Sequence, residues 1–152
     1  MITSRFPQDN DLVYLAEHLR PGDIEELEAV TALKPCEAVI ASVQASDPQF
    51  LRAWLADGEL LCIAGCSPIN TTRAAPWLLG TDLLDKHLLR LTKEARAGVD
   101  AMLAVYPVLS NVIDVRQVRV MRWLKLLGFD MLYSQEARPG FNVMRFERVA
   151  HV

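Results

Sequence analysis

The stretch from residue 74 to residue 114 constrains the fold more than any other part of the chain. The apolar run APWLLGT ends at Gly80 and Thr81, and a long amphipathic segment follows it until Pro107 stops it. A second apolar run, VLSNVIDV, comes next. A strand, a helix and a strand of this kind require a right-handed crossover, which places the two strands parallel. The junction of such a strand with a helix N-terminus is also where many α/β proteins hold a phosphate group.

The segments on either side of this unit predict antiparallel strands. FLRAWLA and ELLCIAGCSPI flank an Asp57-Gly58 turn, and FDMLY and NVMRFERV flank a turn around Pro139-Gly140. A short strand, TSRFPQ, and three helical pieces precede them, and the helix RQVRVMRWLKLL lies before the last strand pair. The sequence therefore predicts an α/β fold: a single domain over 1–152 with a central mixed sheet and helices on both of its faces.

Three aspartates stand where helices are expected to begin. Asp23 follows the break RPG, Asp82 follows a Gly-Thr pair, and Asp114 ends the second parallel strand just before a helix. Because an aspartate at such a position accepts hydrogen bonds from the first free N–H groups, all three are predicted as helix caps. A catalytic role is the alternative for Asp82, and a place at a ligand site is the alternative for Asp114.

Composition excludes several classes of function. The chain has 152 residues, 51% of them hydrophobic, and a formal net charge of −3, so no global basic field attracts nucleic acid or an acidic membrane. No apolar run is long enough to cross a bilayer, and residues 1–15 lack the apolar segment of a signal peptide. An odd number of cysteines without a CxxC pair predicts neither a disulfide framework nor a metal site. The three are expected in the core: Cys36, Cys62 and Cys66.

Three stretches carry a resemblance to a known family. They are LRPGDIEEL (19–27), PWLLGTDLL (76–84) and MRWLKLLGF (121–129). With the hairpin near DGELLCIAG and the closing GFNVMRF, the chain resembles a phage family related to the internal virion protein A of short-tailed phages. That family is described as GNAT-like, after the acyl-CoA N-acyltransferases. The resemblance covers nearly the whole chain and implies the GNAT fold and a phage origin.

The resemblance also implies a place for acetyl-CoA, in the cleft where the parallel strands APWLLGT and VLSNVID splay apart. The backbone of residues 77–80 would pair with the pantetheine arm, and the following turn and helix N-terminus would face the pyrophosphate. The reaction would take place between the strand ends, near Leu79 and Asn111. The implied cofactor-binding residues are Trp77, Leu78, Leu79, Gly80, Thr81, Asp82 and Asn111.

The chain departs from the active enzymes of that fold at two places. Those enzymes carry Q/R-x-x-G-x-G/A at this helix start, where glycines let backbone N–H groups surround the pyrophosphate. Here TDLLDKHLLRL has no glycine, and Asp82 and Asp85 place negative charge where phosphates would lie. A Tyr that donates a proton to the leaving thiolate is replaced by Leu124. The sequence therefore names no catalytic residue.

Two hypotheses of function stay open. In the first, the chain is a phage-encoded assembly or interaction module of the infection cycle with a degenerate acyl-CoA site. Its partners would be phage or host proteins, in the host bacterial cytoplasm or packaged in the virion. In the second, it is an active acetyl-CoA-dependent N-acetyltransferase acting on a protein or a small amine. The late strands are candidates for pairing across a homodimer, and no membrane or nucleic-acid partner is expected in either case.

Overall fold

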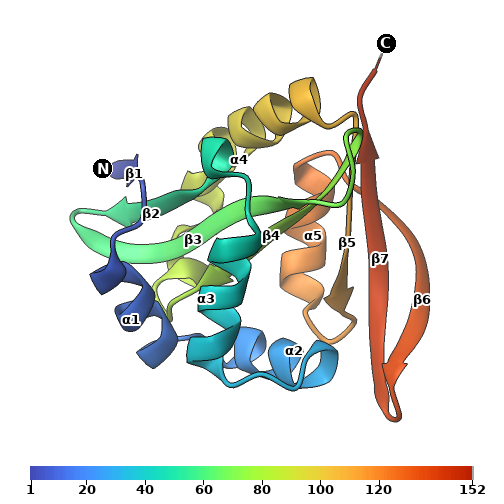
Figure 1. Cartoon of the computed structure of the whole chain (residues 1–152), viewed down its shortest axis with the longest axis horizontal. Coiled ribbons are helices and arrows are strands. Elements are labelled where there is room, and N and C mark those ends of the chain that lie inside the picture. The colour runs from blue at the N-terminus through green and yellow to red at the C-terminus, as the bar shows by residue number, and fades with distance from the viewer. Residues whose placement is uncertain (152) are drawn as a thin grey trace.

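A seven-stranded sheet organises the chain, and the computed structural model describes residues 1–151 (Figure 1). The strand order is β1-β2-β3-β4-β5-β7-β6, and every neighbouring pair is antiparallel except β4 with β5. The strands are β1 (Ile2–Arg5), β2 (Arg52–Ala56), β3 (Glu59–Pro68), β4 (Arg73–Gly80), β5 (Val108–Asp114), β6 (Asp130–Arg138) and β7 (Phe141–Val149). The predicted mixed sheet is thus confirmed.

Helices cover both faces of this sheet. Figure 1 shows α1, α2 and α3 on one side and α4 and α5 on the other. The helices are α1 (Asp9–Glu17), α2 (Pro21–Val30), α3 (Pro35–Ala45), α4 (Leu84–Val105) and α5 (Val118–Leu126), with a short 3₁₀ turn at Pro48–Phe50. The buried apolar residues also form two separate clusters. Leu15, Val39 and Ile63 belong to the first, and Leu88 and Trp123 belong to the second. Each face therefore has its own core.

The parallel pair β4–β5 holds together at one end only. Its register contains just Arg73↔Val108 and Ala74↔Leu109. Beyond these residues the strands diverge toward Gly80 and Asp114, where α4 and α5 begin. We call the opening between the carboxyl halves of β4 and β5 the V.

Both predicted hairpins are present. Asp57 and Gly58 have positive φ angles of 50° and 84°, which suits the two-residue turn that joins β2 to β3. Gly140, with φ 82°, lies in the turn between β6 and β7. β6 is one of the two edge strands, and nearly all its side chains are exposed. This leaves one backbone edge of β6 without a strand partner in the described chain.

Several local predictions are wrong. Helix α2 begins at Pro21 with Arg20 at its N-cap, so Asp23 lies inside the first turn instead of capping it. Helix α4 has Leu83 at its N-cap, and Asp82 is exposed and makes no capping bond. Cys36 is exposed, whereas Cys62 and Cys66 are buried as expected. Of the helices described here, none combines the length and apolar character that crossing a membrane requires.

Candidate functional site

The backbone groups of β4 that face the V are fixed by strand alternation. At one end of β4, Ile69 N–H donates to Arg73 O (2.9 Å), and just past the other, Thr81 N–H donates to Leu61 O (2.9 Å). Residues of an antiparallel strand alternate in the side to which their N–H and C=O point. Trp77 and Leu79 therefore pair with β3, while Pro76, Leu78 and Gly80 turn their backbone groups into the V.

Most of these V-facing groups already have partners within the chain. Pro76 has no N–H, and its carbonyl accepts from Asn111 Nδ2 at 2.8 Å. Gly80 N–H donates to Asp23 Oδ2 (2.7 Å), and Gly80 O accepts from Arg20 N–H (3.0 Å). Leu78 is the remaining V-facing residue, and the register gives it no partner in β5. Residues 77–80 are the backbone predicted to pair with a pantetheine arm. Among them, Leu78 is the V-facing residue whose backbone groups have no partner in β5.

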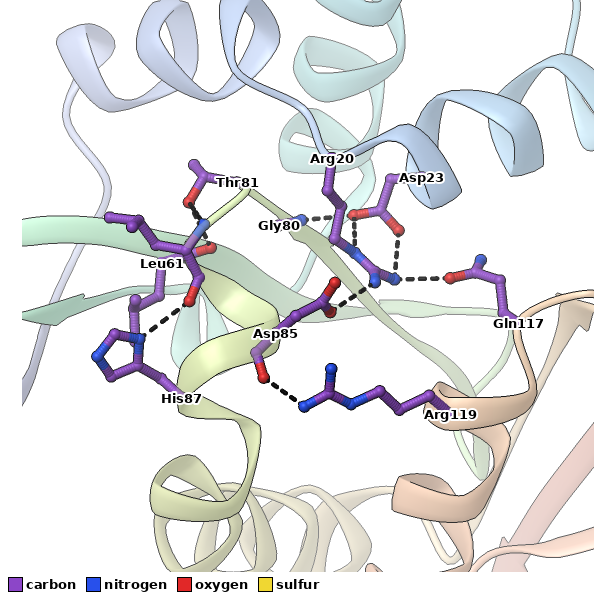
Figure 2. A network of polar contacts seen from close by, with 10 residues as sticks. Arg20, Asp23, Leu61, Gly80, Thr81, Asp85, His87, Gln117 and Arg119 are labelled. Carbon is purple, nitrogen blue, oxygen red and sulfur yellow. Dashed lines mark hydrogen bonds and ion pairs between the residues drawn. The ribbon is translucent and has the colours of Figure 1, made fainter.

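A buried arginine spans the mouth of the V. Figure 2 shows the Arg20 guanidinium between the N-terminal ends of α2, α4 and α5. It donates to Asp23 through Nε and Nη2 (both 3.0 Å), to Asp85 Oδ1 (3.0 Å) and to Gln117 Oε1 (2.6 Å). Burial works against its charge, but the carboxylates of Asp23 and Asp85 raise the pKa of Arg20 above its ordinary value. The guanidinium therefore stays charged and links three helices.

The local sequence RPGD explains how this segment reaches the V. Pro21 at the first helical position needs no hydrogen-bond acceptor for a backbone N–H, and Arg20 and Asp23 are three residues apart, so their side chains meet on one turn. A Cβ on Gly22 would lie 3.0 Å from Gln117 Oε1. The glycine at position 22 therefore allows α2 to approach the start of α5 closely. The bridge Leu19↔Thr81 continues the contact along the end of β4.

Contacts within the protein itself occupy the start of α4. Thr81 turns its hydroxyl back to Leu60 O (2.8 Å). The carbonyl of Asp85 accepts from Arg119 Nη2 at 2.6 Å (Figure 2). A Cβ on Gly80 would lie 2.4 Å from Leu84 Cδ2, so the Leu84 side chain packs directly on the end of β4. An acidic and an apolar side chain thus fill the first turn of α4.

A cavity of about 450 Å³ runs through the sheet beside the V. Pro76 and Leu78 of β4 and Asn111 of β5 line it. Glu26 and Leu27 of α2 line it on one face, and side chains of α4 and α5 line it on the other. Among the predicted site residues, Trp77, Leu78, Leu79 and Asn111 reach this cavity, while Gly80, Thr81 and Asp82 do not.

Glu26 is the functional candidate that sequence reasoning missed. It is half-buried, lines the cavity and accepts a hydrogen bond from Asp114 N–H at 2.7 Å. Burial raises its pKa to about 7, with the charges of Asp23 and Asp114 acting in the same direction against that hydrogen bond. Asp114 itself binds Arg116, whose backbone N–H and guanidinium both donate to it. No local pattern marks Glu26, because its partner lies 88 residues away.

Comparison with solved structures identifies the fold. No protein-family model matches the chain, and no curated protein matches it in sequence. A ribosomal-protein-alanine N-acetyltransferase from Brucella melitensis shares the structure with a TM-score of 0.69 over 97% of this chain and 99% of that one, at 13% identity. An aminoglycoside acetyltransferase, AAC(6')-Ib in complex with coenzyme A, gives 0.67 over 98% and 95% at 18% identity. An acetyltransferase of GNAT family from Streptococcus pneumoniae gives 0.64 over 99% and 100% at 12% identity.

The chain therefore has the GNAT acetyltransferase fold, as the sequence predicted. Because function lives in the site and not in the fold, these identities carry no activity with them. In the part of the chain that the structure describes, no group of three or more His, Cys, Asp or Glu side chains is arranged to hold a metal ion.

Proposed function

We propose that the chain is an interaction module built on an acyl-CoA N-acetyltransferase-like fold, with an acyl-CoA site that is degenerate. The observation that carries this proposal is the occupation of the V by the chain's own N-terminal segment. Both V-facing backbone groups of Gly80 are bound, by Arg20 and Asp23, and the Arg20 guanidinium spans the space between α4 and α5. A pantetheine arm that runs along β4 needs these groups and this space.

Charge and shape at the start of α4 support the same conclusion. The Asp85 carboxylate lies in the first turn of the helix, where a phosphate would sit, and like charges repel. Leu84 covers the end of β4. Leu124 occupies the position of the expected proton donor and has no polar group to donate. The residues present do not fit acetyl-CoA in its ordinary position.

The proposed partners are phage or host proteins, met during infection in the host cytoplasm or inside the virion. The resemblance of residues 19–27, 76–84 and 121–129 to a phage internal virion protein family supports this role. The surface best suited to contact is β6, because its outer edge has unpaired backbone groups and exposes Leu132 and Tyr133. A second copy of the chain could use the same edge to form a homodimer.

The test is isothermal titration with acetyl-CoA, with coenzyme A alone as the control. We expect no binding heat at ligand concentrations near ~1 mM, where a weak site of about −4 kcal/mol would still be seen. A dissociation constant below ~10 μM, about −7 kcal/mol, would overturn the proposal. The partner surface is tested by affinity capture of phage and host proteins with the wild-type chain and with Tyr133→Asp, which should lose the captured partner.

An active N-acetyltransferase is the second candidate, and two observations favour it. The Leu78 N–H faces the V without a strand partner, as a donor to a developing oxyanion would. Glu26 lines the cavity with a pKa of about 7, which suits a general base that takes a proton from an amine near neutral pH. This candidate requires the Arg20–Asp23 segment to leave the V. Tight acetyl-CoA binding together with thiol release that Glu26→Gln abolishes would establish it.

A further inference from the structure

Charge is divided between the two helix layers of the protein. Helices α1, α2 and α3 contain eight carboxylates and neither lysine nor arginine. Helices α4 and α5 contain seven lysines and arginines against three carboxylates, all of them in α4. The two layers pack on opposite faces of the sheet, each over its own apolar core (Figure 1). The formal net charge of −3 is therefore the sum of two layers of opposite sign.

The cations of α4 and α5 have no acidic partner in the protein. They are Lys86, Arg90, Lys93, Arg96, Arg119, Arg122 and Lys125, and all seven are exposed. Within residues 1–151, no ion pair joins any of them to a carboxylate. Arg96 and Arg119 donate to backbone carbonyls, which leave the guanidinium charge unneutralised. We call the surface formed by these seven side chains the basic face.

The carboxylates of α4 do little to neutralise this face. The Asp85 carboxylate binds Arg20 at 3.0 Å. The Asp100 carboxylate binds Arg148 of β7 at 3.1 Å. Glu94 is half-buried and lines the cavity. Helix α5 contributes no carboxylate at all.

The exposed carboxylates of α1, α2 and α3 form a surface of the opposite sign. They are Asp9, Glu17, Glu25, Glu28 and Glu37. Only Glu25 of these forms an ion pair within the described chain, with Arg116 at 3.8 Å. One exposed lysine, Lys34, lies in the loop between α2 and α3. We call the surface of these five carboxylates the acidic face.

Both faces also expose apolar side chains. Leu89 of α4 is 77% exposed and Leu126 of α5 is 49% exposed. Leu89 precedes Lys93 by four residues, so the two side chains are neighbours on one side of the helix. Val13 of α1 and Val30 of α2 are 55% and 43% exposed on the acidic side. A contact between the two kinds of face would bury apolar surface together with the charges.

We propose that copies of this chain associate head to tail, with the basic face of one copy against the acidic face of the next. The two faces lie on opposite sides of the sheet, so one copy cannot pair its own two sets of charges. A symmetric dimer through either face would bring like charges together, whereas a head-to-tail contact pairs opposite charges at every junction. Because each copy leaves one face free, the association extends into a chain or closes into a ring.

A nucleic acid is the competing partner for the basic face. Proteins bind single strands with exposed aromatic side chains that stack on the bases. Helix α4 has no phenylalanine, tyrosine or tryptophan, and the one such residue of α5, Trp123, is 6% exposed. A nucleic acid would also leave the acidic face unused, whereas a second copy uses both faces. The contact involves neither the V nor β6, so it is independent of the function proposed above.

Sedimentation velocity at increasing protein concentration tests the proposal. The Debye length is about 30 Å in about 10 mM NaCl and about 3 Å in about 1 M NaCl, so salt removes attraction between exposed charges. We expect the wild type to associate in the dilute salt, with an association constant at least about tenfold higher than in the concentrated salt. A homodimer through the backbone edge of β6 would persist in about 1 M NaCl.

Charge-reversed variants identify the two faces. Lys93→Glu with Arg122→Glu reverses part of the basic face, and Glu17→Lys with Glu28→Lys reverses part of the acidic face. These four side chains are exposed and lie outside the hydrogen bonds and ion pairs described above, so the fold should be kept. Each variant alone should associate at least about tenfold more weakly than the wild type in about 10 mM NaCl. An equimolar mixture of the two should associate again, because each reversed face then meets its opposite.

A matched pair of variants separates position from net charge. Lys93→Gln with Arg122→Gln and Ser134→Glu with Gln135→Glu lower the net charge by the same amount, the first on the basic face and the second on β6. Only the first should weaken association. A wild type that is monomeric in both salts, equal association in both salts, a mixture that stays monomeric, or equal losses in the matched pair would overturn the proposal. A monomeric wild type that binds a DNA duplex through Lys93 and Arg122 would overturn it in favour of a nucleic-acid partner.

Discussion

Replacing Arg20 by methionine removes the centre of the network that closes the V. Methionine keeps an apolar stem of similar length, so the main loss is the guanidinium and its bonds to Asp23, Asp85 and Gln117. Asp23 is 2% exposed and would keep a single donor, the Gly80 N–H. The substitution therefore leaves a buried carboxylate largely uncompensated.

The cost follows from which carboxylates are buried. Removing one partner of a buried ion pair costs about 3–5 kcal/mol, because the remaining charge has no access to water. The Asp85 side chain is 43% exposed, so water screens it, and exposed pairs are worth about 0.2–1 kcal/mol. Arg20→Met should lower the free energy of unfolding by about 3–5 kcal/mol, and Asp85→Asn by less than about 1 kcal/mol.

Urea unfolding at neutral pH, followed by circular dichroism, measures both values. A third variant sharpens the test: Asp23→Asn removes the buried charge and keeps an acceptor for Gly80 N–H. In that background Arg20→Met should cost clearly less than it does alone, since no buried carboxylate is left without its cation. Equal costs for Arg20→Met and Asp85→Asn, or an unchanged cost in the Asp23→Asn background, would refute the assignment of Arg20–Asp23 as the buried pair.

Two further substitutions test other parts of the site. Because the folded pKa of Glu26, about 7, lies above its ordinary value of 4.5, the folded state holds the extra proton between these values. The stability due to Glu26 should therefore fall as pH rises from about 4.5 to 7, by at most roughly 3 kcal/mol. Subtracting the pH–stability curve of Glu26→Gln from that of the wild type isolates this slope, and a flat difference would contradict it. Gly80→Ala should cost about 1–3 kcal/mol in thermal unfolding, because its Cβ would lie 2.4 Å from Leu84 Cδ2. The cost should shrink in a Leu84→Ala background, and if it does not, the strain lies elsewhere.

The parallel unit and the hairpins could be predicted because their causes are local. The predicted amphipathic segment after Thr81 requires only the helical repeat. On the buried face of α4 lie Leu84, Leu88, Leu91, Val99 and Met102. The Asp57-Gly58 turn depends on two adjacent residues that tolerate positive φ. The cap predicted at Asp82 is wrong because the chain continues as a turn there. Helix α4 starts two residues later, at Leu84.

The surroundings of the V could be predicted only in part. The lack of glycine in residues 81–91 and the leucine at position 124 are visible in the sequence. The cap predicted at Asp23 was inferred from neighbouring residues alone, and it is wrong. In the structure that carboxylate accepts a hydrogen bond from Gly80 N–H, 57 residues away. The position of Glu26 on the cavity wall has no sequence signal, because it depends on elements that meet only after folding.

The sequence by itself determined the order of the elements, the parallel pair β4–β5, the two hairpins and a sheet with helices on both faces. These follow from interactions between residues a few positions apart. Only the tertiary structure decided what fills the V. Arg20 reaches Asp85 and Gln117, 65 and 97 residues further along the chain, and which side chain enters a gap depends on how helices from distant segments pack against it. Hydrogen bonds between residues so far apart produce no hydrophobic periodicity and no motif spacing, so the sequence alone does not predict them.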